Sequence, residues 1–197
     1  MSTVGVIGTG NIGGTLGRAF ARGGYQVVFG SRSPEGSAAA GDTGAKVGTV
    51  VEAVAAGEVV VLALPGTEVE GFLLEHGAAL DGKVVVDATN SFPGPVLNAA
   101  ALFAAHAPGA RYARAFSSQA WETFATPPAD GGPSDLPFSS AAEDRETVAA
   151  LIESVPGLRA YYLGADAQDQ VDAAIALLFP AFSTRGRSVS LRIVTNG

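Results

Sequence analysis

The chain has 197 residues, no cysteine, two histidines and a formal net charge of −7. This length suits one large domain, or a domain with a small added lobe, and allows an adequate core. Without cysteine there is no disulfide framework, no thiolate metal site and no cysteine nucleophile. Two histidines are too few for most metal sites, so we expect no metal. The negative charge argues against nucleic acid as a partner. No signal peptide or long apolar span is apparent, so we expect a cytoplasmic protein that does not enter a membrane.

An apolar strand, a glycine turn and a helix open the chain. The strand spans residues 4–7, and Gly8, Gly10 and Gly13 follow it before a helical run with one apolar face. The first glycine permits a tight turn, the second lets a pyrophosphate approach the backbone, and the third lets the helix pack on the strand. The N-terminus of such a helix offers unpaired N–H groups to phosphates. The motif predicts dinucleotide binding, and the alternative is a glycine turn with a purely structural role.

The end of the second predicted strand, residues 25–29, indicates which dinucleotide is bound. An acidic residue here would bind the ribose 2′-hydroxyl of NAD, whereas an arginine accommodates the 2′-phosphate of NADP. No acid occurs between Gly8 and Ser33, and the strand leads into Ser31 and Arg32. Thr9 adds a hydroxyl on the same side. We therefore predict NADP(H), the alternative for Arg32 being an ordinary solvated loop cation.

Strand and helix signals alternate along the next part of the chain, which is typical of a doubly wound parallel sheet. Ligands of such sheets bind outside the carboxyl ends of the strands, where Pro65, Asn90 and Ser117 fall. Turn chemistry alone would also explain Pro65 and Asn90. The predicted strands are residues 45–47, 58–64, 83–88 and 112–116, and the predicted helices are residues 49–56, with Thr49 as cap, 69–80 and 95–105.

The composition changes after residue 116. A Pro- and Gly-rich loop at 126–137 leads into predicted strands at 136–140 and 158–163, predicted helices at 144–155 and 166–182, the last interrupted near Pro180, and an edge strand or extended tail at 189–194. The fold class is therefore α/β, a Rossmann-type doubly wound parallel sheet with a small C-terminal α/β lobe. We divide the chain into an NADP-binding Rossmann domain, residues 1–116, and a C-terminal substrate or dimerisation lobe, residues 117–197.

With these segments in place, the chain resembles the NADP oxidoreductases that depend on the deazaflavin coenzyme F420. The resemblance rests on GTGNIGGTLG at 8–17, GSRSPE at 30–35, VVVLALPGTEV at 59–69, VVVDATNSF at 84–92, RAFSSQAWETFATP at 114–127 and TRGRSVSLRI at 184–193. It implies a dimeric reductase in which the deazaflavin stacks on the nicotinamide in the cleft between the two lobes.

The resemblance also implies roles for individual residues. The 2′-phosphate would be held by Thr9, Ser31 and Arg32. The pyrophosphate would lie on Gly8, Gly10, Asn11, Ile12 and Gly13, and the adenosine and nicotinamide path would be lined by Leu64, Pro65 and Asn90. The sequence departs from the family pattern at Ser117 and Ser91, where asparagine and proline are frequent, and serine cannot present a bidentate amide.

Hydride transfer between two cofactors needs orientation and electrostatics rather than a nucleophile. A reductase of a carbonyl or imine would want a proton donor, for which Ser117, Ser118 and Tyr112 are candidates. Three hypotheses compete: a reductase that passes hydride between NADP(H) and F420 or a flavin-like acceptor, an NADPH-dependent reductase of a small imine, enone or carbonyl compound, and a noncatalytic dinucleotide-binding sensor. The apolar last helix and the resemblance predict a homodimer.

Four further side chains have two interpretations each. Trp121 and Phe124 could form a stacking wall over a flat ring, although a core or interface position is the more usual one. Arg185 and Arg187 could meet an acidic cofactor tail or lie in a solvated turn. Three aspartates are spaced for the first turns of the last helix, where we expect a structural role: Asp166, Asp169 and Asp172.

Overall fold

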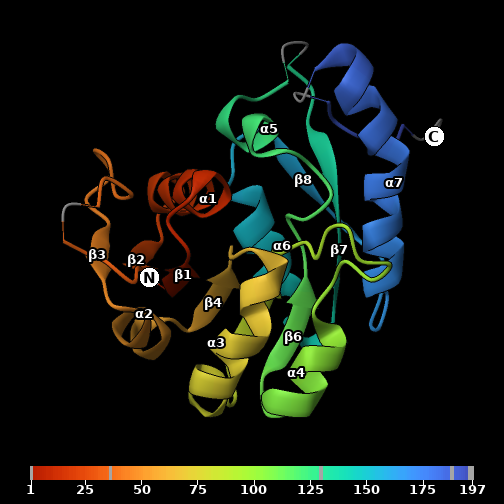
Figure 1. The fold of residues 1–197 in the computed structure, drawn as a ribbon. Helices are drawn as coiled ribbons and strands as arrows, with labels where there is room; N and C mark the ends of the chain where they lie inside the picture. Colours follow the sequence, from red (N-terminus) through yellow and green to blue (C-terminus); the bar gives the residue numbers. More distant parts are fainter. Residues whose placement is uncertain (1, 36, 129–130, 187–188, 195–197) are drawn as a thin grey trace.

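A computed structural model describes residues 2–35, 37–128, 131–186 and 189–194 of the protein (Figure 1). The described residues form an eight-stranded sheet with the order β3-β2-β1-β4-β5-β6-β7-β8. The first six strands are parallel, β7 is antiparallel to β6, and β8 is parallel to β7. The strands are β1 (Thr3–Ile7), β2 (Gln26–Gly30), β3 (Lys46–Gly48), β4 (Val59–Leu62), β5 (Val84–Asp87), β6 (Arg111–Arg114), β7 (Ser134–Ser140) and β8 (Leu158–Tyr162).

Helices cover both faces of the sheet. Side chains of α1, α5 and α6 pack into one hydrophobic core, and side chains of α2, α3 and α4 pack into a second core on the other face. Figure 1 shows α1 and α2 on opposite sides of the sheet and α7 alongside β7. The α-helices are α1 (Asn11–Arg22), α2 (Val50–Ala56), α3 (Val69–His76), α4 (Ala100–His106), α5 (Trp121–Ala125), α6 (Arg145–Glu153) and α7 (Gln168–Arg185). Short 3₁₀ helices are η1 (Gly66–Glu68), η2 (Gly77–Leu80) and η3 (Ala142–Asp144).

The strand order confirms the predicted Rossmann-type fold class. Strands β4 and β5 are buried along their whole length, which explains why their sequences are runs of valine rather than alternating patterns. The order reverses between β1 and β4, so the crevice for a ligand lies outside the carboxyl ends of these strands. The proposed domain boundary at residues 116 and 117 falls shortly after β6, and β7 continues the same sheet. The division into two domains stays a prediction.

The predicted helix ends were partly right. The Thr49 side chain accepts from the Glu52 N–H, and the Thr49 N–H donates to Glu52 Oε2 at 2.7 Å, which forms a capping box at the start of α2. Helix α4 begins at Ala100 rather than at residue 95, because the preceding segment turns so that the Ala99 N–H can donate to the buried Asp87. The helix formed by Trp121–Ala125 was not predicted.

The predicted interruption near Pro180 was wrong, since α7 runs through Pro180 to Arg185. Proline removes one helical N–H, and the carbonyl four residues earlier, that of Ala176, lies on the exposed side of the helix where water can serve it. Residues 189–194 form no strand; this segment lies beside β7, where the Asp135 N–H donates to the Leu191 carbonyl at 2.7 Å.

Candidate functional site

The glycine loop lies where the sequence predicts it, between β1 and α1 at the reversal of strand order. Gly8 has φ +107°, and a Cβ there would collide with the carbonyl oxygen of Ala63. A Cβ on Gly13 would collide with the carbonyl oxygen of Gly8. These two glycines are therefore required by the close approach of the loop to the end of β4 and to itself. The predicted Leu64 is also close, with Cδ2 3.4 Å from the position of a Gly8 Cβ.

Gly10 differs from its neighbours, because nothing lies within 4 Å of the position where its Cβ would stand. It is the N-cap of α1, with no side-chain cap, and the first turn, which includes Asn11 and Ile12, holds no acidic residue. The fold itself would therefore accept a larger residue at Gly10. A side chain there would, however, obstruct an anion that approaches the free N–H groups of the first turn. The residues present fit the pyrophosphate of a dinucleotide.

Ser31 and Arg32 lie at the carboxyl end of β2. The Ser31 N–H donates to the Gly48 carbonyl at 2.9 Å, and its Oγ accepts from the Ser33 N–H at 3.1 Å. The Arg32 side chain is 89% exposed, and its Nη1 lies 3.8 Å from Glu68 Oε2 on η1. An ion pair this exposed is weak, so the guanidinium can exchange its partner for a phosphate. Thr9 is half-buried in the glycine loop.

The loops after β4 and β5 meet beside this crevice. Pro65 is exposed at the start of η1, and a Cβ on Gly66 would collide with Ser91 Oγ. The serine that replaces the family's proline is thus packed against the loop after β4. Asn90 is half-buried, with its amide held at both ends: Arg114 Nη2 donates to Asn90 Oδ1 at 2.8 Å, and Asn90 Nδ2 donates to the Ser117 carbonyl at 3.0 Å. A cofactor contact by Asn90 stays a prediction.

Arg114 is the centre of a buried polar network that sequence reasoning missed. Its side chain is fully buried, and the guanidinium lies 3.2 Å from Asp87 Oδ2 and 2.7 Å from Asp172 Oδ1. It also donates to the carbonyls of Asp87 and Thr89. Asp172 comes from α7 and was interpreted only as a helix-end acid, but here it ties α7 to β6. The signal was present as Asp87 and Arg114, charged residues at the carboxyl ends of the neighbouring strands β5 and β6.

Tyr112 was a candidate proton donor, and the network gives it another partner. Its hydroxyl donates to Asp87 Oδ2 at 2.8 Å, and its ring packs on Phe103 of α4 with centroids 5.0 Å apart. Burial, with the Asp87 carboxylate beside the hydroxyl, raises the pKa of Tyr112 far above its usual range. Tyr112 therefore stays protonated and bound within the fold.

Ser117 and Ser118 follow β6 at its carboxyl end. Both residues are buried, and neither Oγ has a hydrogen-bond partner among the residues that the structure describes. The preceding Phe116 has φ +60°, a strained conformation for a bulky residue. A buried hydroxyl without a partner costs about 1–3 kcal/mol. A role of either hydroxyl in ligand binding stays a prediction.

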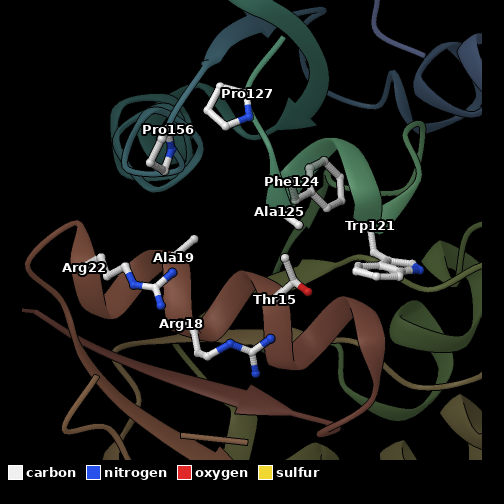
Figure 2. Close-up of a pocket in the computed structure, with 9 residues that line it drawn as sticks. All are labelled: Thr15, Arg18, Ala19, Arg22, Trp121, Phe124, Ala125, Pro127 and Pro156. Carbon is white, nitrogen blue, oxygen red and sulfur yellow. The ribbon is translucent and has the colours of Figure 1, made fainter. Parts of the chain in front are cut away.

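The aromatic residues that follow separate into two environments. Phe124 is buried and meets Phe116 edge to face with ring centroids 5.8 Å apart, which is a core position. Trp121 is half-buried and lines a pocket between α5 and α1 (Figure 2). Arg185 is exposed at the end of α7, and Arg187 lies outside the described residues.

The described part of the chain contains no helix that is long and apolar enough to cross a membrane. It also contains no group of three or more histidine, aspartate or glutamate side chains placed to hold a metal ion.

Fold and site together define a Rossmann-type dinucleotide-binding protein. The family model for NADP oxidoreductases dependent on coenzyme F420 matches residues 3–91, which confirms the resemblance over the glycine loop, β2 and the strands that line the crevice. The match supports the oxidoreductase class.

Solved structures share the fold. A protein from Arthrobacter sp. FB24, provisionally described as an F420-dependent NADP reductase, is 20% identical with a TM-score of 0.82, covering 99% of this chain and 100% of its own. A hypothetical protein from Sinorhizobium meliloti is 27% identical with a TM-score of 0.72, covering 84% and 86%. A reductive aminase from Aspergillus terreus, solved with NADPH and ethyl levulinate, is 21% identical with a TM-score of 0.70, covering 93% of this chain but only 62% of the aminase.

Proposed function

We propose that the protein is an NADP-dependent oxidoreductase that transfers hydride between NADP(H) and a deazaflavin such as F420, or a flavin-like acceptor. The observation that supports it most is the open approach at Gly10, directly before the uncapped N-terminus of α1 and beside the acid-free end of β2. The family match over residues 3–91 agrees with this assignment.

When bound, NADP(H) supplies or accepts the hydride at its nicotinamide ring. The backbone N–H groups of Asn11 and Ile12 would hold the pyrophosphate, and Ser31 and Arg32 would hold the 2′-phosphate. The buried, unpartnered hydroxyls of Ser117 and Ser118 would donate to the nicotinamide or to the acceptor beside it if the turn after β6 opened to them.

The buried network has a positioning role in this proposal. Arg114 holds Asn90, and Asn90 in turn holds the Ser117 carbonyl. The loop after β5 and the turn after β6 are therefore fixed relative to each other before any ligand arrives. Pre-organisation of this kind lowers the cost of bringing two rings together.

A reductase of a small imine, enone or carbonyl compound is the second candidate. The reductive aminase and a Streptomyces aurantiacus imine reductase, 24% identical, share the fold. Such chemistry needs a proton donor beside the acceptor atom. Tyr112 is engaged with Asp87, so a serine hydroxyl relaying a solvent proton would have to serve. This favours the deazaflavin reading, in which the protein manages little proton transfer.

One experiment separates the hypotheses. The purified protein is mixed with NADPH and oxidised F420, with FMN, or with a cyclic imine, and the absorbance of donor and acceptor is followed together. Coupled loss of NADPH and oxidised F420 is the expected result. NADPH loss with the imine alone would support the second candidate, and NADPH binding without turnover would support a noncatalytic sensor.

We also propose that the protein is a homodimer. Leu177 and Phe179 on α7 are 68% and 55% exposed, and Phe92, 50% exposed, packs against Phe179 with ring centroids 6.0 Å apart. An apolar surface of this kind is typical of an interface. Light scattering should give twice the chain mass, and Phe179→Glu should shift the protein to a monomer.

A further inference from the structure

A pocket of about 180 Å³ lies between α1 and α5, and the proposed chemistry does not use it (Figure 2). Figure 2 shows Thr15 and Ala19 pointing from α1 toward α5 and the segment after it. The lining residues are Thr15, Arg18, Ala19, Arg22, Trp121, Phe124, Ala125, Pro127 and Pro156. Two cations and an aromatic wall in one pocket suit an anion joined to an apolar group.

The two arginines are available to an anion. Arg18 Nη1 donates to the Ala39 carbonyl at 3.1 Å, and among the described residues no carboxylate forms an ion pair with this arginine. The remaining N–H groups of its guanidinium fork keep their donor capacity. Arg22 pairs with Asp42 at 3.2 Å, but both side chains are largely exposed, at 61% and 85%. A pair this exposed contributes little and can be exchanged.

Arg18 is also held in place. A Cβ built on Gly14 would lie 3.1 Å from Arg18 Nη1, so the guanidinium folds back over the first turns of α1 and lies close to Gly14. A Cβ built on Gly41 would lie 3.1 Å from Arg18 Cδ, so the aliphatic part of the Arg18 side chain is packed as well. An arginine fixed before binding loses less side-chain entropy on contact with an anion.

The opposite wall is apolar and rigid. Phe124 is buried against Phe116, and Pro127 packs on Gly157, where a Cβ would lie 2.9 Å from Pro127 Cβ. Trp121 is half-buried and offers its indole ring to the pocket. Phe124, which lines the pocket, packs on Phe116, the residue before Ser117. This contact links the pocket to the place where we put the acceptor.

The volume limits what can enter. It is close to that of a cavity of about 150 Å³ that accepts a single benzene ring, and well below the roughly 300–1,000 Å³ of a complete ligand site. A single ring that carries one anionic group fits, whereas a whole dinucleotide or deazaflavin does not. The pocket is thus a subsite for part of a ligand.

We propose that the pocket between α1 and α5 binds an anionic arm of the hydride acceptor, so that the acceptor carries a carboxylate or phosphate next to an apolar group. This inference rests on the proposed function, because it assigns the pocket to the acceptor. Arg18 and Arg22 bind the anion, and Trp121 with the prolines covers its apolar neighbour.

The single tryptophan makes the test direct, since Trp121 is the only one in the chain. Protein saturated with NADP⁺, so that the nucleotide phosphate sites are filled, is titrated with phenyl phosphate and with uncharged benzyl alcohol while Trp121 fluorescence is recorded. We expect a saturable response to phenyl phosphate, at least tenfold weaker with benzyl alcohol. Arg18→Gln and Arg22→Gln should each weaken phenyl phosphate binding at least fivefold, and Arg145→Gln, a control at an exposed arginine at the start of α6, should leave it unchanged.

Equal responses to the two probes would overturn the proposal, as would unchanged phenyl phosphate binding in both pocket variants. It would also be overturned if Arg18→Gln weakened NADP⁺ binding tenfold without affecting phenyl phosphate, because Arg18 would then belong to the nucleotide site. Failure of the proposed function is seen separately: calorimetry would show no NADP⁺ binding, while the phenyl phosphate titration of the free protein still reports on the pocket.

Discussion

Gly10→Ala should abolish most dinucleotide binding while leaving the fold intact. Gly10 has φ −73° and ψ −165°, which alanine adopts freely, and no atom lies within 4 Å of the new Cβ. Alanine is a poorer N-cap than glycine by about 1 kcal/mol, but it also restricts the unfolded chain by about 0.4–1 kcal/mol. The two terms nearly cancel, so the unfolding midpoint should move by less than about 4 °C.

Binding should respond very differently, because the new methyl group occupies the approach of the pyrophosphate. We expect at least a tenfold loss of NADP⁺ affinity, about 1.4 kcal/mol. At a hundred times the wild-type Kd, NADP⁺ stabilises the wild-type protein by about 2.7 kcal/mol. The variant should keep about half of that stabilisation or less. Differential scanning calorimetry with and without NADP⁺ measures both quantities in one experiment.

Two other glycines serve as controls. Gly71→Ala, on the open side of α3, should raise stability by up to about 1 kcal/mol and leave NADP⁺ affinity unchanged. Gly8→Ala should disrupt folding, since its φ is +107° and the Cβ would meet backbone. If Gly10→Ala bound NADP⁺ like the wild type, or if it unfolded, the placement of the pyrophosphate at Gly10 would be refuted.

Three further outcomes follow from the buried groups. Arg114→Met leaves the carboxylates of Asp87 and Asp172 without their cationic partner, so the free energy of unfolding should fall by about 3–5 kcal/mol in urea titrations. If the free energy of unfolding fell by less than it does on substitution of an exposed arginine, the network would be contradicted. Ser117→Ala and Ser118→Ala should keep or slightly raise stability, since each removes an unpartnered hydroxyl, yet lower turnover; unchanged turnover in both would remove them from the site. Burial opposes ionisation of Asp135, but hydrogen bonds from the Arg159 side chain and from the Ile193 N–H outweigh this effect and lower the pKa of Asp135. Its stabilisation is present above about pH 4 and lost as the pH falls through the lowered value, so the stability of Asp135→Asn should depend less on acid there.

Much of the fold and the glycine loop could be predicted because their signals are local. Gly8 and Gly13 lie in one short loop whose close backbone contacts exclude a Cβ at either position. The valine runs of β4 and β5 are contiguous in the sequence. In each case the residues that interact are near neighbours in the chain. The NADP preference inferred from Ser31 and Arg32 also rests on neighbouring residues, and it stays a prediction.

The buried network could not be predicted in the same way. Arg114 meets Asp87 and Asp172 across 27 and 58 positions of sequence, and only the register of β5 with β6 and the placement of α7 bring them together. The helix interruption predicted at Pro180 was wrong for a related reason. The free-energy cost of a proline inside a helix depends on whether the carbonyl one turn earlier is exposed to water, and the local sequence does not show this. The pocket beside Trp121 likewise requires α5 to pack on α1, which no short motif encodes.

The most direct test of the central claim is calorimetric titration of the wild-type protein and Arg32→Ala with NADPH and with NADH. The proposed site predicts that the wild type binds NADPH at least tenfold more tightly than NADH, and that Arg32→Ala loses most of this preference while its NADH affinity barely changes. Equal affinities for the two dinucleotides in the wild type, or equal weakening of both in the variant, would contradict the assignment of the 2′-phosphate to Ser31 and Arg32.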